Sequence, residues 1–397
     1  MRRAGGSRTG PALVRRLLAA AGALVVSTAV AGCADVPPGE PTGALAVVVG
    51  ARSNMPPVDL DGVAGQVLGN AVDTQARVSF VVADGAPFVL ATTQLETVGE
   101  DSAAWQASEA ENLQQLRNSI ASAAARSPEA DLLAALGMAA GEIASAPGKR
   151  VVLVADSGLS TAGPLDFRRP GLLDADPGDV VASLQAAGSL PDLRGVHLVF
   201  QGLGDTAAPQ PALSGVTRDQ LVELWTAIGL AAGALDVNVE RSPLEGEPAP
   251  GFPPVSVVSP GGGLTCTANT VVLGGGDVSF QADTAAFQDA AAAAAKLQPI
   301  ADRMQAAGVT ATLTGTTADV GDEEGQRQLS EQRAQAVADL LGGLGVPAER
   351  MTVVGLGSDF PGYVQDRDGS GTLDPAAAAQ NRKVTIELVG AGPAVCA

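Results

Sequence analysis

The sequence predicts an α/β protein in which an open, doubly wound sheet is followed by a smaller βαβαβ sandwich. Continuous apolar runs at residues 44–49 and at 151–155, within the strand predicted at 150–155, are what strands covered on both faces require. Hydrophobic residues make up 46% of the chain and aromatic residues only 3%, so the core must consist of Ala, Val and Leu, which suits helices packed on sheets. At roughly 100–200 residues per domain, 397 residues are enough for about two domains.

The first predicted domain covers residues 44–240. Further strands are predicted at residues 77–83, 88–92, 150–155, 196–200 and 236–240. Helical spacing of apolar residues predicts helices at residues 104–126, 129–144, 179–187 and 218–232. The turn Asp84-Gly85-Ala86-Pro87 joins the second and third strands as a hairpin. This alternation of strands and helices favours an open sheet with helices on its faces.

Residues 241–265 are rich in Pro and Gly and are predicted to be a linker. The second predicted domain covers residues 266–397. Its elements are a strand pair at 271–280, a long Ala-rich helix to 307, a strand at 310–316, a polar loop, a helix at 329–344, a strand at 351–356 and a last strand at 383–389.

The composition excludes several classes of function. The formal net charge of -19 argues against a general nucleic-acid binder held by phosphate neutralisation. One histidine, His197, and three cysteines are too few for zinc clusters, Ser-His-Asp triads or Cys-His dyads. We therefore expect no catalytic residues, no enzymatic activity and no required cofactor, and we expect His197 to be a packed residue of an apolar strand.

The N-terminus has the pattern of an export signal. Residues 1–32 hold five arginines and no acidic residue, and residues 17–31 are uncharged and mostly apolar. Val30-Ala31-Gly32-Cys33 resembles the bacterial lipobox, which implies cleavage before Cys33 and a diacylglycerol on its thiol. Residues 33–43 then form a Pro-rich tether, and the protein is expected to be extracytoplasmic and anchored to a membrane by lipid. An ordinary secretory signal with a chance cysteine is the alternative.

Removal of the signal makes the remaining chain more acidic. Loss of its five arginines changes the formal charge from -19 to -24, so general attraction to anionic lipid is not expected. Cys266 and Cys396 remain, and in an oxidising compartment this even number predicts one disulfide. Two free buried thiols are the alternative.

The order of elements in residues 44–240 resembles the von Willebrand factor A fold. That family grips a divalent ion with Asp-x-Ser-x-Ser after its first strand, where this sequence has Gly50, Arg52 and Asn54. Asp156 matches the later aspartate of the family. A hard cation prefers charged oxygen ligands, and one carboxylate is a poor site. We therefore expect an interaction domain that binds no metal.

Residues 266–390 resemble the C-terminal domain of the OmpA family. The residues that carry the resemblance are Gly315-Thr316-Thr317, Gly321, Leu329-Ser330-Glu331-Gln332-Arg333-Ala334, Gly355-Leu356-Gly357 and Asn381-Arg382-Lys383-Val384. The resemblance implies non-covalent binding of peptidoglycan through diaminopimelate, with an arginine on its carboxylate and an aspartate on its amine. The guanidinium group of arginine suits a carboxylate because it can donate one hydrogen bond to each of the two oxygens.

Residue by residue, the resemblance places the arginine at Arg333 and the loop threonine at Thr317. The aspartate position is Ala318, with Asp319 beside it, and the loop asparagine is Gln326. Asn381 and Arg382 complete the implied peptidoglycan site. The alternative is that Arg333 binds no ligand and only forms an ion pair with Asp319 or Glu331.

Two functions follow from these resemblances. The first is an envelope tether that links a membrane to peptidoglycan through the OmpA-like domain. The second is an interaction or assembly scaffold for other envelope proteins, in which the OmpA-like domain has lost peptidoglycan binding. The departure at Ala318 and the lost metal motif favour the second function, although the domain keeps the scaffold and the arginine that the first function needs.

An acidic turn near the C-terminus fits part of a calcium loop. Its oxygen side chains at positions 1, 3, 5 and 9 are Asp366, Asp368, Ser370 and Asp374. Position 12, usually a bidentate Glu, is Ala377. We expect weak calcium binding at best, and the alternative is a plain Asp/Gly turn.

Overall fold

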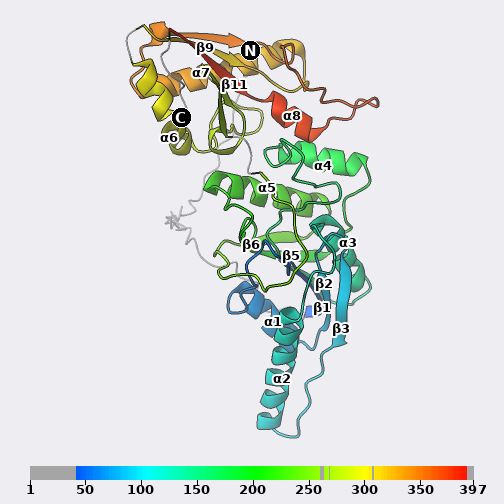
Figure 1. Cartoon of the computed structure of the whole chain (residues 1–397). Helices are drawn as coiled ribbons and strands as arrows, with labels where there is room; N and C mark the ends of the chain where they lie inside the picture. Colours follow the sequence, from blue (N-terminus) through cyan, green and yellow to red (C-terminus); the bar gives the residue numbers. More distant parts are fainter. Residues whose placement is uncertain (1–41, 260–262, 268, 306–307, 391–397) are drawn as a thin grey trace, which may run out of the picture. The chain divides into compact units, whose positions relative to one another are not determined.

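The computed structural model describes residues 42–259, 263–267, 269–305 and 308–390, which form two sheets with their helices (Figure 1). The first sheet has six strands in the order β3-β2-β1-β4-β5-β6. The strands are β1 (Thr42–Val49), β2 (Arg77–Val82), β3 (Phe88–Gln94), β4 (Lys149–Ala155), β5 (Val196–Gln201) and β6 (Asp236–Glu240). Neighbouring strands are parallel except for β3, which pairs antiparallel with β2 as the predicted hairpin.

Both faces of the first sheet are covered by helices, as the continuous apolar strands predict. In β1, Ala44, Ala46 and Val48 face one buried cluster, and the residues between them face another. The helices are α1 (Val63–Asp73), α2 (Ser102–Ala121), α3 (Leu132–Ile143), α4 (Pro177–Ala186) and α5 (Gly215–Ala231). Helices α1 and α2 contribute to the second cluster, and α3, α4 and α5 to the first. The α/β fold class is confirmed.

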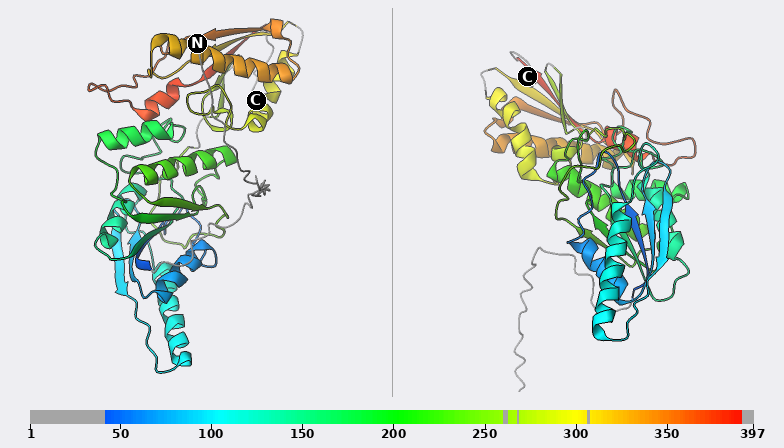
Figure 2. Two further views of the ribbon diagram at one scale, coloured as in Figure 1. Left: turned by 180° about the vertical axis from the view of Figure 1, so that it is seen from behind. Right: turned by 60° about the horizontal axis from the view of Figure 1, so that its bottom comes forward.

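Helix α2 differs from the others because its first half contacts little else. Residues 102–107 are all exposed, and Figure 2 shows α2 (cyan) extending past the end of the sheet. The helix begins at Asp101, whose carboxylate accepts a hydrogen bond from the amide of Ala104 at 2.8 Å. Its C-terminal half buries Leu116 and Ile120 against the sheet.

The first sheet and its helices α1–α5 form what we call the first lobe, and the second sheet with α6–α8 the second lobe. The predicted Pro/Gly linker is held against the first lobe over residues 241–259. Leu244 N donates to Asp205 Oδ2 at 2.8 Å, and Val258 N donates to Gln210 Oε1 at 2.8 Å. The side chains of Leu244, Val255 and Val258 are buried. We call residues 241–259 the strap, because hydrogen bonds and apolar contacts fasten it along the lobe.

The second sheet has five strands in the order β10-β9-β11-β8-β7. They are β7 (Leu264–Thr267), β8 (Thr270–Leu273), β9 (Thr310–Gly315), β10 (Met351–Gly355) and β11 (Val384–Val389). Strands β9 and β10 are parallel, and β11 runs antiparallel to both β9 and β8. Short 3-10 turns lie at Gly276–Val278 and Ala348–Arg350.

Two long helices cover one face of the second sheet (Figure 2). They are α6 (Ala290–Met304) and α7 (Glu323–Gly343), and a short helix, α8 (Pro375–Asn381), precedes β11. In β9 the burial alternates, with Ala311 and Leu313 in the core beneath the helices. Among the described residues, none of the helices has the length and hydropathy needed to cross a bilayer.

Candidate functional site

Two glycines bring α7 close to the ends of β9 and β10. A Cβ on Gly315 would stand 1.9 Å from the carbonyl oxygen of Ser330, and one on Gly355 would stand 2.5 Å from the amide nitrogen of Glu331. Both distances are far below van der Waals contact, so these positions require glycine. The close approach places the first turns of α7 beside the loop that follows β9.

The loop at residues 316–322 is fixed by hydrogen bonds to neighbouring segments. Thr316 Oγ1 donates to the carbonyl oxygen of Asn381 at 2.6 Å, and Thr317 N donates to that of Gly357 at 2.9 Å. Asp322 caps α7 by accepting from Gly325 N at 2.9 Å. Helix α7 therefore begins six residues before the predicted start at 329, and Gln326 lies in its first turns rather than in a loop.

A pocket of about 140 Å³ opens between this loop and α7. Four of the residues predicted to bind peptidoglycan lie together in its lining, namely Thr317, Gln326, Arg333 and Arg382. Ala318 also lines the pocket. The carboxylates in the lining belong to Asp283 and Asp322, which the sequence analysis did not select.

Arg333 lies at the base of the site and is only 6% exposed. Its Nε donates to the carbonyl oxygen of Thr284 at 2.9 Å, and its guanidinium carbon lies 5.4 Å from the centre of the Phe280 ring. Burial, and after it the charge of Arg382, lower the pKa of Arg333 to about 10, with Asp283 acting in the opposite direction. Arg333 thus remains a cation at neutral pH. In the described part of the chain Arg333 forms no ion pair with Asp319 or Glu331, and Asp319 lies beside Arg367 instead.

Two polar atoms in the pocket lining have no hydrogen-bond partner in the described part of the chain. They are Thr317 Oγ1 and Arg382 Nη1, and both are buried. The other terminal nitrogen of Arg382 donates to Asp179 Oδ2 at 2.6 Å. A buried polar atom without a partner costs free energy.

The structure places the other two predicted residues outside this pocket. Asp319 Oδ1 accepts from Gln326 Nε2 at 3.2 Å, and Asp319 Oδ2 lies 3.3 Å from Arg367 Nε. Asn381 is fully buried and exchanges two hydrogen bonds with the backbone of Val364, at 2.9 and 2.7 Å. Asn381 therefore holds the segment before the acidic turn in place.

The side chains of the predicted calcium loop already have protein partners. Asp366 is buried and accepts from Tyr363 Oη and from Asn381 Nδ2. Asp368 Oδ1 accepts from the amide and hydroxyl of Ser370, and Asp374 caps α8. Among the residues that the structure describes, no group of three or more His, Cys, Asp or Glu side chains could hold a metal ion.

In the first lobe, an arginine stands where the resemblance would put a metal ion. Arg52 Nη1 lies 2.5 Å from Asp156 Oδ2 and donates to the carbonyl oxygen of Ala83 at 2.6 Å. Arg52 Nη2 donates to Asp156 Oδ1 at 3.2 Å and to Ser157 Oγ at 3.3 Å. Both side chains are almost fully buried. The residues present do not fit a divalent cation, because the guanidinium takes both oxygens of the carboxylate.

Three further predicted features lie elsewhere. His197 Nδ1 lies 2.7 Å from Asp236 Oδ2 across the neighbouring strands β5 and β6. Cys33 and Cys396 lie outside the described residues, whereas Cys266 lies on β7. The lipid attachment and the disulfide therefore stay predictions.

Comparisons with known proteins place a family domain over this site. No curated protein matches the chain. Among solved structures, the peptidoglycan-associated lipoprotein from Burkholderia pseudomallei is 28% identical, with 28% of this chain and 88% of that chain covered and a TM-score of 0.24. The cell wall anchor of the T6SS from Pseudomonas aeruginosa is 25% identical, with 33% and 89% covered and a TM-score of 0.27.

A third similar structure is the periplasmic domain of Helicobacter pylori MotB, which is 17% identical, with 32% of this chain and 87% of that chain covered and a TM-score of 0.26. The family model that matches this sequence is that of the OmpA family, over residues 279–379. This range contains the loop after β9, all of α7 and Arg333. The second lobe of the chain thus carries an OmpA family domain.

Proposed function

We propose that the protein is a lipid-anchored envelope protein whose OmpA family domain binds peptidoglycan non-covalently and so links a membrane to the wall. The observation that carries the proposal is the pocket at the start of α7. It brings together a buried cationic arginine, Arg333, and the side chains of Thr317 and Arg382. Arg333 and Thr317 lie inside the residues matched by the family model. Such a set of groups is suited to a carboxylate.

The same pocket supplies carboxylates for the amine of a zwitterionic ligand. Ala318 stands where the resemblance expects the aspartate, and Asp319 is engaged by Gln326 and Arg367. Asp283 and Asp322 line the pocket with Arg333. We therefore assign the amine-binding role to Asp283 or Asp322 and predict that Asp319 has none.

Retention on purified sacculi that contain diaminopimelate tests this proposal. The experiment uses the chain from residue 34 onward, and compares wild type with Arg333→Gln. Arg327→Gln is the matched control, because it removes the same charge from the same helix at an exposed ion pair with Glu324. We expect wild type and Arg327→Gln to be retained and Arg333→Gln to be released. Equal retention of all three proteins would contradict the assignment of the pocket.

Carboxylate variants separate the amine-binding candidates. Asp283→Asn and Asp322→Asn are compared with Asp319→Asn in the same assay. A loss of retention in one of the first two, with Asp319→Asn unchanged, is the expected result. Asp322 also caps α7, so its variant needs a circular dichroism spectrum and a melting curve equal to those of wild type before its loss is assigned to binding.

The membrane attachment is tested separately. Cells that express the full chain are fed a clickable fatty acid, and the protein is recovered and its label measured. We expect labelling of wild type and none of Cys33→Ala. Label on the Cys33→Ala protein would refute lipid attachment at this residue.

We further propose that the first lobe is a von Willebrand factor A-like interaction domain that works without a metal ion. Its strand order, with an antiparallel edge strand β3, and the pairing of Arg52 with Asp156 support this proposal. Calorimetric titration with Mg²⁺ or Mn²⁺ is expected to show no saturable binding. Tight binding of either ion would overturn the proposal.

A protein-interaction scaffold is the second candidate function, and two departures in this chain favour it. Ala318 removes the carboxylate that the resemblance expects, and Arg382 is already paired with Asp179. On this alternative, wild type would not be retained by sacculi at all. The retention assay therefore decides between the two functions.

A further inference from the structure

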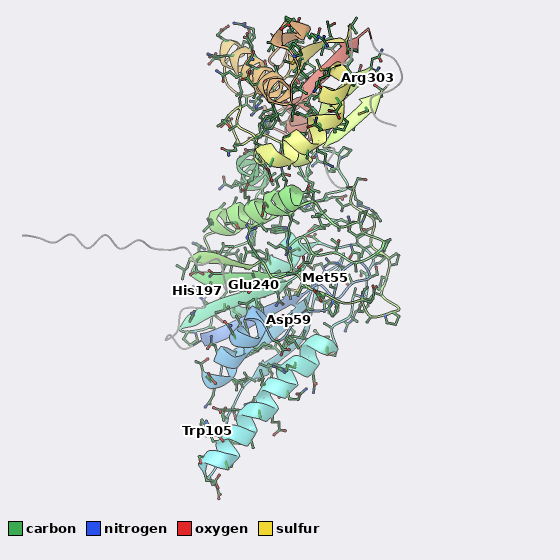
Figure 3. All side chains as sticks on the ribbon, turned by 90° about the vertical axis from the view of Figure 1, so that its left-hand side faces the viewer. Met55, Asp59, Trp105, His197, Glu240 and Arg303 are labelled. Carbon is green, nitrogen blue, oxygen red and sulfur yellow. The ribbon has the colours of Figure 1, made fainter. Side chains whose placement is uncertain are left out.

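The two lobes belong to one compact unit and contact each other beside the pocket that we assign to peptidoglycan. Most ion pairs of the described residues lie within one lobe. His197 and Asp236, for example, lie on the neighbouring strands β5 and β6, and Figure 3 shows His197 at the first sheet. Two ion pairs among the described residues instead join the lobes. One of them connects Asp179 of α4 to Arg382, which lines the pocket.

Helix α8, which ends next to Arg382, packs against the first lobe. Ala376 and Ala379 of α8 belong to the same buried cluster as Leu172, in the loop between β4 and α4. A Cβ on Gly171 would stand 2.4 Å from the carbonyl oxygen of Ala376, so this close approach requires glycine. The first lobe therefore holds α8 and, with it, the position of Arg382.

Hydrogen bonds fasten both ends of α8 to the same loop of the first lobe. Arg169 Nη2 donates to the two carboxylate oxygens of Asp374, the N-cap of α8, at 2.8 and 2.7 Å. Near the other end of the helix, Gln380 Nε2 donates to the carbonyl oxygen of Pro170 at 2.8 Å. Polar and apolar contacts thus fix α8 on the first lobe together.

Neither terminal nitrogen of Arg382 is available to a ligand in this arrangement. Its Nη2 donates to Asp179 Oδ2 at 2.6 Å, and the two side chains are only 22% and 21% exposed. Its Nη1 is buried, without a partner among the described residues, so a ligand does not reach that atom either. A ligand carboxylate can therefore pair with Arg382 only after the contact with Asp179 has broken.

Further carboxylates of the first lobe lie close to the same cations. A cavity of about 110 Å³ has Asp174 and Asp176 of the first lobe in its lining, together with Arg333 and Arg382 of the second. These two arginines also line the peptidoglycan pocket. The first lobe thus places negative charge beside the two positive charges that a ligand carboxylate would need.

We propose that the first lobe gates the peptidoglycan pocket. In the closed arrangement Asp179 holds Arg382, and peptidoglycan binds when this ion pair breaks and the guanidinium turns to the ligand carboxylate. The gate rests on the proposed function, because it regulates the same pocket. A protein that is only partly in its binding-competent form binds with an affinity reduced by that fraction. Removal of Asp179 should therefore strengthen binding, whereas removal of a residue that contacts the ligand weakens it.

Calorimetric titration of the chain from residue 34 onward, with a soluble stem peptide that ends in diaminopimelate, compares wild type with Asp179→Ala. Asp176 remains as the N-cap of α4, so the variant should fold as wild type does. Asp192→Ala is the matched control, because it removes a carboxylate that lies 2.6 Å from Arg194 within the first lobe. We expect Asp179→Ala to bind at least about threefold more tightly than wild type, and Asp192→Ala to bind as wild type does.

The possible results distinguish the gate from the proposed function. If wild type binds the stem peptide and Asp179→Ala binds it equally or more weakly, the gate is wrong and the proposed function stands. If neither protein binds, the proposed function is wrong, and the gate with it.

A measurement without ligand tests the contact itself. Nuclear magnetic resonance relaxation of the Arg382 Nε–H group, assigned by its loss in Arg382→Lys, reports how firmly the guanidinium is held. We expect a rigid group in wild type and in Asp192→Ala, and a mobile group in Asp179→Ala. Equal mobility in all three proteins would overturn the gate, whether or not the chain binds peptidoglycan.

Discussion

Replacement of Arg52 by Met should destabilise the first lobe strongly. The change removes four hydrogen bonds from a guanidinium that is fully buried and leaves the carboxylate of Asp156, 1% exposed, without its cation. Asp156 would keep a hydrogen bond from Gly158 N at 2.8 Å, which does not neutralise its charge. Breaking a buried ion pair on one side costs about 3–5 kcal/mol of the free energy of unfolding.

A double variant distinguishes the loss of the ion pair from the cost of leaving the Asp156 carboxylate buried without a cation. In the double variant Arg52→Met/Asp156→Leu, neither charge remains in the interior. Replacing both members of a buried pair by apolar groups is often nearly neutral, so the double variant should be more stable than Arg52→Met alone. This inversion, in which a second substitution restores stability, is the signature of a buried charge pair.

The fluorescence of Trp225 reports this region directly. Its indole Nε1 donates to the carbonyl oxygen of Gly158 at 3.0 Å, two residues after Asp156. Trp105 is the only other tryptophan, and Trp105→Phe removes its signal. Urea unfolding of the chain from residue 34 onward, in this background, gives the free energy of unfolding of each variant. If Arg52→Met lowers the free energy of unfolding by less than about 1 kcal/mol, the substitution does not leave a buried, unpaired charge at Asp156.

Four further results are expected. Retention on sacculi should be constant between pH 6 and 8 and should fall as the pH passes about 10, which is the lowered pKa of Arg333. Above that pH the neutral side chain no longer attracts a carboxylate. Constant retention through pH 11 would contradict this prediction. Gly315→Ala should destabilise the second lobe, because its Cβ would meet the carbonyl oxygen of Ser330, whereas Gly342→Ala in α7, with open space around it, should stabilise it by up to about 1 kcal/mol; calorimetry measures both. Mass spectrometry without reduction should find the peptides of Cys266 and Cys396 linked, and separate peptides would refute the disulfide. Millimolar calcium should leave the melting temperature unchanged, and a saturable rise that Asp366→Ala abolishes would instead establish the calcium loop.

The strands of the first sheet could be predicted well because their signal is local. In the second sheet, β7 begins inside the segment predicted to be a linker, and the strand pair predicted at 271–280 is only β8 followed by a 3-10 turn. Residues 44–49 are apolar without interruption, and the structure extends this run by two residues to β1. The hairpin of β2 and β3 follows from the Asp-Gly turn between them. Helix α1 was missed, because Gly65 and Gly69 weaken its helical propensity and its N-cap, Gly62, provides no side-chain hydrogen bond.

The candidate site could be predicted only in part. Thr317, Gln326, Arg333 and Arg382 were found from the resemblance, and the structure brings them into one pocket. Asp283 was missed because it lies about 50 residues before Arg333, outside the motifs that carry the OmpA family resemblance. No local sequence pattern connects the two residues. Asp322 carried a signal, since an aspartate followed by two glutamates is typical of a helix start, and it would have moved the predicted start of α7.

The pairing of Arg52 with Asp156 could not be predicted from local sequence patterns either. The sequence showed an arginine in the loop after β1 and a lone aspartate after β4, 104 residues later. Only the parallel pairing of β1 with β4, in which Val49 lies opposite Ala155, brings the two loops together. The packing of the strap could not be predicted for the same reason, because the sequence of a Pro-rich segment does not show which surface it contacts.

The proposed function requires the pocket around Arg333 to bind the zwitterionic end of a peptidoglycan stem peptide. The most direct measurement is a titration of the isotopically labelled chain, from residue 34 onward, with a soluble stem peptide that ends in diaminopimelate, followed by nuclear magnetic resonance. We expect saturable shifts confined to the amides of the loop at residues 316–322 and the first turns of α7, and their loss in Arg333→Gln but not in Arg327→Gln. Unchanged spectra at millimolar peptide, or equal shifts in both variants, would contradict the proposed function.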